Sequence, residues 1–196
     1  MNSMIEKVIT ERRTIRQFIN TPLDDNLLND LLETSSYAPY HHHIEPWNVI
    51  IAKTHEEKML FLEEVFASYD RNNILKNVAE DKYLQIKENY KDAFVTPAVT
   101  MIVTAAQYET EKENFDAIAA TSAFIQNFQL LAWEKEIGVV WRTNPFIFDQ
   151  TFAKAMGVPE NHKIVGSLQV GYFDQKQKTK TKKRRPLNEW VKRVLS

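Results

Sequence analysis

Glycine is scarce in this chain of 196 residues, and its placement limits how the chain could fold around a phosphate group. The four glycines are scattered over the last third of the sequence, at Gly138, Gly157, Gly166 and Gly171. A P-loop or a G-x-G-x-x-G turn needs clustered glycines, because backbone N–H groups must come close to the phosphate. The sequence contains neither motif. If the chain binds a phosphorylated ligand, side chains must hold the phosphate.

Length and composition predict a single domain over residues 1–196, since 43% of the residues are hydrophobic. Cysteine is absent, which excludes disulfides, thiol nucleophiles and cysteine-ligated metals and is consistent with a reducing compartment. The formal net charge of −1 provides no overall attraction to nucleic acid or to membranes. No segment has the apolar core of a secretory leader or the length of a bilayer span. We therefore expect a cytoplasmic protein.

Capping residues predict where the first two helices begin. Ser3 with Glu6 forms a capping box for a helix near the N-terminus. Thr21 is expected to cap a second helix, with Pro22 in its first turn. Both helices carry apolar residues at helical spacing.

Strand-like runs alternate with the helices. "WNVIIA", "AVTMIVTAA", "VVWR" and "KIVGSLQVGYF" are predicted as strands, and the second is apolar nearly throughout, which is typical of a central strand. The longest helix is expected from about Glu113 to Glu136, and Gly138 is expected to end it. This mixture fits either parallel crossovers or an α+β arrangement, and the pattern alone does not decide between them.

Two segments are expected to lie outside the core. Residues 55–90 are charged and helical in character. Four apolar residues in the first half of that segment are expected to face inward: Leu60, Phe61, Val65 and Phe66. Residues 67–94 have the pattern of an exposed helix or a cover, and residues 174–196 that of a basic arm followed by a short amphipathic helix, "LNEWVKRVL".

Three consecutive histidines lie in "YAPYHHHIEPW", between Pro39 and Pro46. Neighbouring side chains in an extended loop project to alternating sides, so they do not close one coordination shell, and we expect no metal there. Two interpretations remain: a surface loop with exposed imidazoles, or a rigid loop whose ring faces line a pocket.

Three segments could bring charge to a ligand. In "ERRTIRQF" the side chains of Arg12, Thr14 and Arg16 could hold one anion, although cations at a helix end also complement the helix dipole. The basic run "KTKTKKRRP" could be a solvated arm, a nucleic-acid patch or a second source of phosphate ligands. Nucleic acid is the weaker interpretation, because no aromatic residues interleave with the run. "GVVWRTNPF" places an arginine and polar donors at a strand end, either as ligand contacts or as a polar turn.

In order and spacing, five segments resemble the FMN-dependent nitroreductase family: "ERRTIRQF", "YAPYHHHIEPWNVIIA", "TPAVTMIVTA", "QNFQLLAWEKEIGVVWRTNPF" and "HKIVGSLQVGYF". The resemblance is strongest to the small single-domain type. It implies an α+β, three-layer fold with a mixed, mainly antiparallel sheet flanked by helices. It also implies a homodimer with FMN bound between the subunits.

The resemblance further implies which residues contact FMN: Arg12, Arg13, Thr14, Arg16, Tyr37, His41, Trp141, Arg142, Thr143, Lys183 and Arg185. Arg12 and Thr14 would hold the phosphate together with the C-terminal pair, Lys183 and Arg185. Arg16 would lie near the pyrimidine edge of the ring. The loop residues Tyr37 and His41 would come from the partner chain. Trp141, Arg142 and Thr143, at the end of a strand, would lie along the isoalloxazine. Residues 131–136 match a region that contacts nicotinamide in relatives.

Two departures from the family pattern leave substrate choice open. Glu45 stands where relatives commonly have Gln, and "TNPF" replaces an acidic-glycine pair. The activity implied is transfer of hydride from NADH or NADPH through flavin N5 to a nitroaromatic, quinone or similar acceptor. Because the flavin carries the chemistry, no protein residue is assigned as catalytic. The alternative is a flavin-binding protein without turnover, used for storage or sensing.

Overall fold

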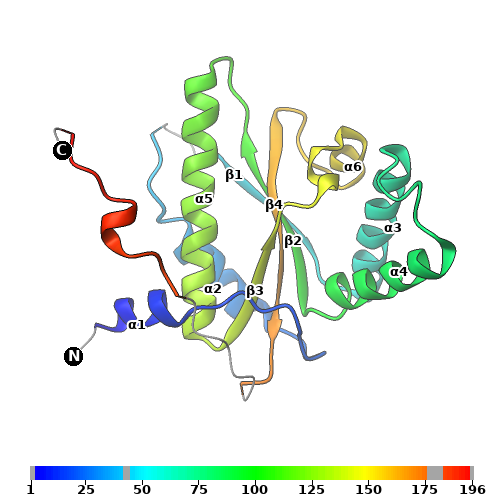
Figure 1. The fold of residues 1–196 in the computed structure, drawn as a ribbon, viewed down its shortest axis with the longest axis horizontal. Coiled ribbons are helices and arrows are strands. Elements are labelled where there is room, and N and C mark those ends of the chain that lie inside the picture. Colours follow the sequence, from blue (N-terminus) through cyan, green and yellow to red (C-terminus); the bar gives the residue numbers. More distant parts are fainter. Residues whose placement is uncertain (1–2, 42–44, 176–182, 195–196) are drawn as a thin grey trace.

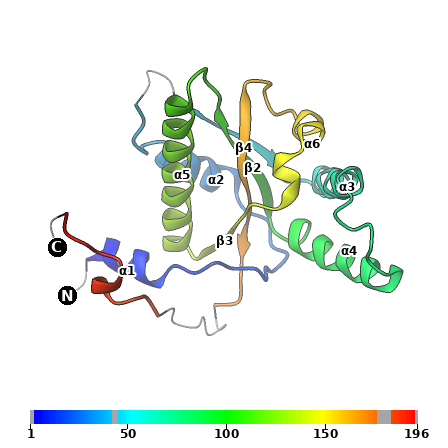
Figure 2. The same cartoon turned by 45° about the horizontal axis from the view of Figure 1, so that its top comes forward.

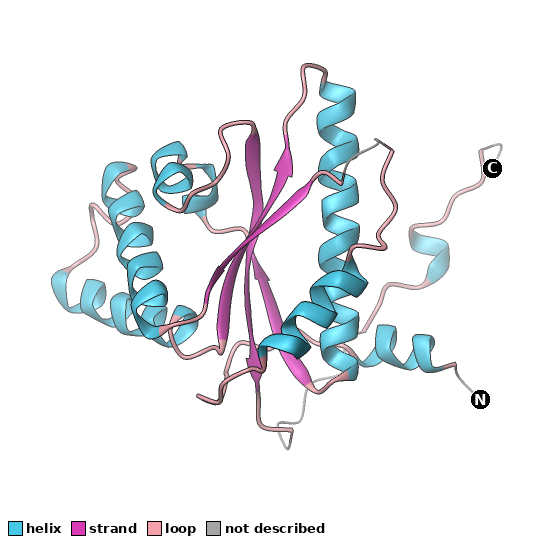
Figure 3. Ribbon diagram, turned by 180° about the vertical axis from the view of Figure 1, so that it is seen from behind, coloured by secondary structure: helices cyan, strands magenta, loops and turns pink. Residues whose placement is uncertain are grey.

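The computed structural model describes residues 3–41, 45–175 and 183–194. The described chain has an α+β fold of three layers, in which one sheet carries helices on both faces (Figure 1; Figure 3). The helices are α1 (Met4–Glu11), α2 (Asp25–Ser35), α3 (His55–Arg71), α4 (Glu80–Phe94), α5 (Glu111–Glu134) and α6 (Gln150–Ala155). The strands are β1 (Trp47–Ala52), β2 (Val99–Ala106), β3 (Ile137–Arg142) and β4 (His162–Tyr172). Two short 3₁₀ turns follow, η1 (Pro145–Phe148) and η2 (Leu187–Glu189).

The four strands form one antiparallel sheet in the order β1-β2-β4-β3. The prediction that "AVTMIVTAA" is a central strand is confirmed, because β2 lies between β1 and β4 and is buried over nearly its whole length. A parallel element is also present among the described residues, as an isolated bridge between Thr14 and Val139. The edge strand β3 is therefore extended by the segment that follows α1.

Helices cover the sheet unequally, and each face has its own core. Helices α2 and α5 cover one face, while α3, α4 and α6 lie on the other (Figure 2). On the first face Phe128 of α5 is fully buried with residues of β2 and β4. On the second face Phe61 of α3 packs against Phe94, Phe146 and Phe152 at ring-centroid separations of 5.3, 5.8 and 5.6 Å. Within the described residues, no helix is long and apolar enough to cross a membrane.

The capping box at Ser3 and Glu6 is confirmed, but the predicted start of the second helix is wrong. The side chain of Asp24, not that of Thr21, accepts the hydrogen bond from the Leu27 N–H that begins α2. Leu23 is 1% exposed and lies in the core just before the helix begins. Burial of this leucine keeps the chain extended past Thr21, so the helix starts later than its capping pattern suggested.

The predicted charged helix over residues 55–90 is two helices, α3 and α4. Phe61, Val65 and Phe66 face inward as expected, but Leu60 is 53% exposed. Leu60 points about 100° away from its neighbour Phe61, which reaches the core, so the Leu60 side chain turns toward solvent. Helix α4 is mostly exposed, and Phe94 is its one described buried residue.

The long helix is confirmed, two residues earlier at each end than expected, but Gly138 does not end it. The left-handed backbone position is occupied by Glu136, with φ of 58°. Gly138 lies inside β3 against Ile15, where an added β-carbon would come within 2.7 Å of the Ile15 Cβ. Glycine is required at position 138 because a side chain there would collide with Ile15. It does not provide the conformation that ends a helix.

The amphipathic helix predicted in "LNEWVKRVL" is wrong, because only the single turn η2 forms. Leu187, Trp190 and Val191 are 64%, 57% and 47% exposed, so no apolar surface of the described chain covers this segment. A helix this short is unstable without such packing. Residues 176–182, the first part of the predicted basic arm, lie outside the described residues.

Two substitutions at the junction of α5 and β3 should have opposite effects. Glu136→Gly should raise the free energy of unfolding by about 0.5–1 kcal/mol, because glycine adopts positive φ without a β-carbon clash. Gly138→Ala should lower it by about 1–3 kcal/mol through collision with Ile15. Urea denaturation of both variants and the parent protein measures the changes. A stable Gly138→Ala variant would show that Ile15 does not rest on residue 138.

Candidate functional site

The segment after α1 is attached to the edge of the sheet. The Ile15 N–H donates to the Val139 carbonyl at 3.2 Å, and the Ile15 side chain is 4% exposed, against Gly138. In an extended chain the neighbours of a buried residue point away from it. Thr14 is accordingly half-buried and Arg16 exposed, both at the rim of β3.

Three arginines gather where this segment leaves α1. We call Arg12, Arg13 and Arg184 the Arg12 cluster. Arg12 is half-buried, and its pKa is lowered first by burial and then by the positive charges of Arg13 and Arg184. Neither Arg12 nor Arg184 forms an ion pair with a carboxylate in the part of the chain that is described. Like charges held together without a counter-ion favour binding of an anion.

Arg13 also has a structural role. Its guanidinium donates to the carbonyl oxygens of Thr10 and Arg12 at 2.7 and 2.8 Å, where α1 ends. These bonds satisfy helix carbonyls, as the helix-dipole interpretation of this cation expects. The two interpretations of "ERRTIRQF" thus apply to different residues within it.

The sequence reasoning missed Arg184. It selected Lys183 and Arg185, which are exposed on either side of it, while the charge that acts on Arg12 is that of Arg184. All three lie in the basic run "KKRR", which indicates that a cation of this segment could reach a phosphate. The composition of the run does not tell which of its side chains approaches α1. Residues 183–194 lie on the same side of the molecule as α1 (Figures 1 and 2).

The strand-end residues point in different directions. Trp141 packs on the α5 face of the sheet, and its Nε1 is buried with no hydrogen-bond partner among the described residues. A β-carbon at Gly166 would collide with this indole, so Gly166 is needed for close approach. Thr143, beyond the end of β3, is exposed. The indole is half-buried with its Nε1 toward the interior, and Thr143 is available to a ligand.

Arg142 projects from the opposite face of the sheet. Its Nε donates to Gln169 Oε1 at 2.9 Å, and its guanidinium lies 5.7 Å from the centre of the Phe94 ring. Burial and then the charge of Arg16 lower the pKa of Arg142, while Tyr90 and Tyr69 act in the opposite direction. Arg16 and Arg142 thus form a second cationic group near the strand end.

Helix α4 is joined to this strand end by a small hydrogen-bond network. The Asn144 side-chain amide donates to the Tyr90 hydroxyl at 3.2 Å, and the hydroxyls of Tyr90 and Tyr69 are 3.0 Å apart. Burial, together with Tyr90, raises the pKa of Tyr69, so this hydroxyl remains protonated at neutral pH. The network connects α3, α4 and the loop after β3.

Tyr37 and His41 are the two described loop residues that the sequence predicts to contact a flavin. Tyr37 is 86% exposed, His41 is exposed, and no described interaction joins either residue to an arginine of the site. His42 and His43 lie outside the described residues. No group of three or more potential metal ligands occurs in residues 3–41, 45–175 and 183–194.

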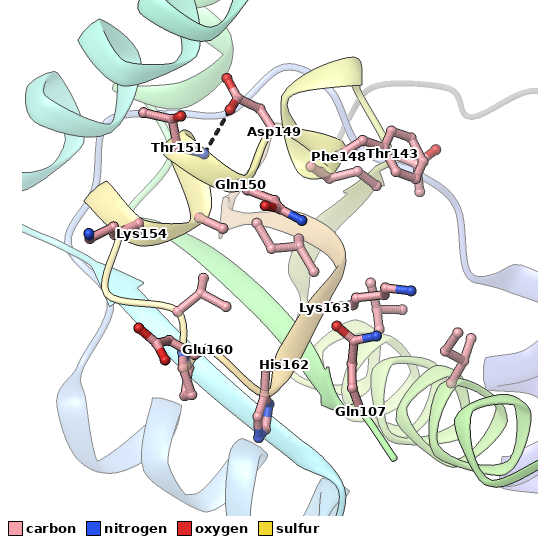
Figure 4. Close-up of a pocket in the computed structure, with 17 residues that line it drawn as sticks. Gln107, Thr143, Phe148, Asp149, Gln150, Thr151, Lys154, Glu160, His162 and Lys163 are labelled. Atoms are coloured by element: carbon pink, nitrogen blue, oxygen red, sulfur yellow. Dashed lines mark hydrogen bonds between the residues drawn. The ribbon is translucent and has the colours of Figure 1, made fainter. Parts of the chain in front are cut away.

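A cleft of about 940 Å³ opens beside the strand end (Figure 4). Thr143 is the predicted site residue that lines it, and Phe148, 79% exposed, lies near it in the picture. Charged residues of both signs line other parts of the wall: Asp149, Lys154, Glu160 and Lys163. His162, also on the wall, has its Nδ1 2.9 Å from Thr104 Oγ1, and burial lowers its pKa.

The chemistry of the donors fits FMN, whose phosphate needs cations in a chain without a glycine-rich loop. The Arg12 cluster and the Thr14 hydroxyl could donate hydrogen bonds to a phosphate, and Arg16 could place positive charge at the edge of a flavin. The structure gathers Arg12, Arg13, Thr14, Arg16, Arg142 and Thr143 around β3. It leaves Tyr37 and His41 elsewhere on this chain.

Comparison with known proteins gives a consistent result. A family model described as the nitroreductase family matches residues 9–172. YfhC of Bacillus subtilis (strain 168), whose name assigns it provisionally as an NAD(P)H nitroreductase, is 32% identical over 96% of this chain and 93% of its own. The crystal structure of a nitroreductase-like family protein from Bacillus cereus has a TM-score of 0.84 and 30% identity, covering 100% of this chain and 98% of that one.

A more distant structure shares the fold. The nitroreductase with bound FMN from Desulfitobacterium hafniense has a TM-score of 0.71 and 21% identity, covering 99% of this chain and 100% of that one. The family match includes the segment 12–16 and the whole sheet, which together hold Arg12, Arg13, Arg16 and Arg142. On this evidence, the chain belongs to the nitroreductase family.

Proposed function

We propose that this protein is an FMN-dependent oxidoreductase that passes hydride from NADH or NADPH to an electron-poor acceptor, such as a nitroaromatic or a quinone. The observation that carries the proposal is the Arg12 cluster, in which half-buried Arg12 lies near the positive charges of Arg13 and Arg184 and forms no ion pair with a carboxylate of the described residues. Relatives that bind FMN or are named for NAD(P)H support it. When bound, FMN supplies the redox chemistry by accepting hydride at N5 and passing it on.

The residues of this chain then bind FMN, orient its ring and shield it from water. Arg12, Arg184 and the Thr14 hydroxyl hold the phosphate, with Lys183 and Arg185 beside them. Arg16 places positive charge near the pyrimidine edge, where reduction builds negative charge. Thr143 offers a hydroxyl at the strand end. Helix α4, attached through Tyr90 and Asn144, covers this region and limits the access of water.

We also infer that the protein is a homodimer. Helix α1 has no buried residue, and its apolar residues Met4, Ile5 and Ile9 are 71%, 70% and 53% exposed. Phe115 on α5 is 73% exposed. Apolar side chains of this size on neighbouring helices mark an interface. A second copy would also bring Tyr37 and His41 to the flavin. The absence of cysteine supports a cytoplasmic location, and residues 1–196 are proposed to act as one domain.

Loss of a cation from the Arg12 cluster should weaken FMN binding. Arg12→Ala and Arg184→Ala should each raise the dissociation constant of FMN about tenfold or more, because a charge-assisted hydrogen bond is lost. Fluorescence titration of the apoprotein measures the constant. Arg185→Ala, one residue further along, should have the smaller effect, and Lys112→Ala on α5 should have none. An Arg184→Ala variant that binds FMN like the parent would remove Arg184 from the site.

Turnover distinguishes an enzyme from a flavin-binding protein. Anaerobic mixing of the purified FMN-loaded protein with NADH or NADPH should bleach the flavin absorption band within seconds, a rate typical of enzymes. Stopped-flow absorbance records the change, and later addition of a nitroaromatic or quinone should restore the band. Colour that persists with both nicotinamides would favour storage or sensing.

The dimer can be tested by placing a charge on α1. Ile5→Glu should shift the protein from dimer to monomer in analytical ultracentrifugation, because a carboxylate cannot be buried unpaired in an apolar interface. Leu84→Glu is the matched control, since Leu84 is 57% exposed on α4, on the other face of the sheet. A dimeric Ile5→Glu variant, or a monomeric parent protein, would contradict the proposed interface.

A further inference from the structure

The guanidinium of Arg142 is held from behind. Gln169, which accepts from Arg142 Nε, is fully buried on β4, and its own amide donates to Ser167 Oγ at 3.3 Å. Ser167 is directly opposite Arg142 in the β3–β4 register. The ring of Phe94 lies against the guanidinium. These contacts restrict the rotation of Arg142 and determine which of its nitrogens face the sheet.

The outer nitrogens are available. No acceptor in the described chain takes a hydrogen bond from Arg142 Nη1 or Nη2, although the side chain is half-buried. An arginine with a purely structural role at this depth would be expected to have a carboxylate or carbonyl there. Here the charged group that acts on Arg142 is another arginine, Arg16, and the other groups that influence it are the hydroxyls of Tyr90 and Tyr69. A planar guanidinium that is held through Nε, and whose Nη1 and Nη2 can still donate hydrogen bonds, suits an anion that accepts two of them.

This second cationic group is separate from the one assigned to the phosphate. The charges acting on Arg12 come from Arg13 and Arg184, whereas Arg142 is influenced by Arg16. Arg16 also suffices for the single negative charge that a reduced flavin develops at its pyrimidine edge. Arg142 therefore remains for a different anion. Its surroundings, Phe94 and Tyr90 of α4, are aromatic.

We propose that Arg142 binds a carboxylate, or a planar anion of similar shape, on the electron acceptor, and that the preferred acceptors are anionic electron-poor aromatic compounds. Gln169 acts as a positioning residue, because it holds Arg142 without reaching the ligand itself. Arg16 adds long-range attraction. This inference rests on the proposed function, since it names the class of acceptor for that reaction.

Binding can be tested apart from turnover. Benzoate and benzamide, which match in shape but differ in charge, are titrated into the FMN-loaded protein while the flavin absorption spectrum is recorded. We expect benzoate to bind about tenfold or more tightly, the difference that a bidentate charged pair supplies. Arg142→Gln should abolish this preference. Gln169→Leu keeps the charge but removes the support, and should reduce the preference several-fold with no loss of FMN.

Turnover gives the second readout. The preference of the parent protein for 4-nitrobenzoate over 4-nitrobenzamide in kcat/KM should match the binding preference and should lie mainly in KM. Lys112→Gln, which removes an exposed cation from α5 instead, should keep the full preference in both assays. Equal binding of benzoate and benzamide by the parent protein would overturn the proposal, as would an undiminished preference in Arg142→Gln.

Three further outcomes complete the test and distinguish failure of this inference from failure of the function on which it rests. Benzoate that releases FMN through a filter would place the anion at the Arg12 cluster and overturn the assignment to Arg142. A protein that bleaches with NADH or NADPH but shows no benzoate preference would refute the acceptor class alone. A protein that takes up no FMN would refute both proposals.

Discussion

The contact between Ile15 and Gly138 is the constraint on which the candidate site depends. The isoleucine fills the space that the missing β-carbon leaves, and its N–H bonds to Val139. Together these contacts attach the segment after α1 to the edge of the sheet, and the alternation of an extended chain then turns Thr14 and Arg16 outward. Burial of one apolar side chain thereby positions two polar ones.

The site is organised around Arg12 and Arg142, which form no ion pair with a carboxylate of the described residues. Arg12 and Arg142 are both half-buried, and both have a pKa lowered by burial and by neighbouring arginines. Such an arrangement costs stability in the ligand-free protein and favours whatever anion enters. Arg13 differs, because it bonds to carbonyls at the end of α1. A basic cluster in a sequence can therefore combine a helix cap and ligand-binding residues, and only the contacts distinguish them.

Sequence patterns succeeded where a residue's own neighbours along the chain decide its structure. The capping box at Ser3 and the central strand β2 followed from local chemistry and hydrophobic pattern. They failed where distant contacts intervene. Burial of Leu23 delays α2, and the close packing of Ile15 accounts for Gly138, which a local pattern attributed to the end of a helix.

By itself, the sequence determined the fold class through its resemblance to a family, the order of the strands and helices, and the need for side chains to hold any phosphate. Tertiary structure decided which cations meet. Arg184 comes near Arg12, and Arg16 near Arg142, although long stretches of chain separate the members of each pair. Hydrophobic and hydrogen-bonding patterns along a chain report local geometry, but the distance between remote charges depends on how the sheet and its edge segments pack.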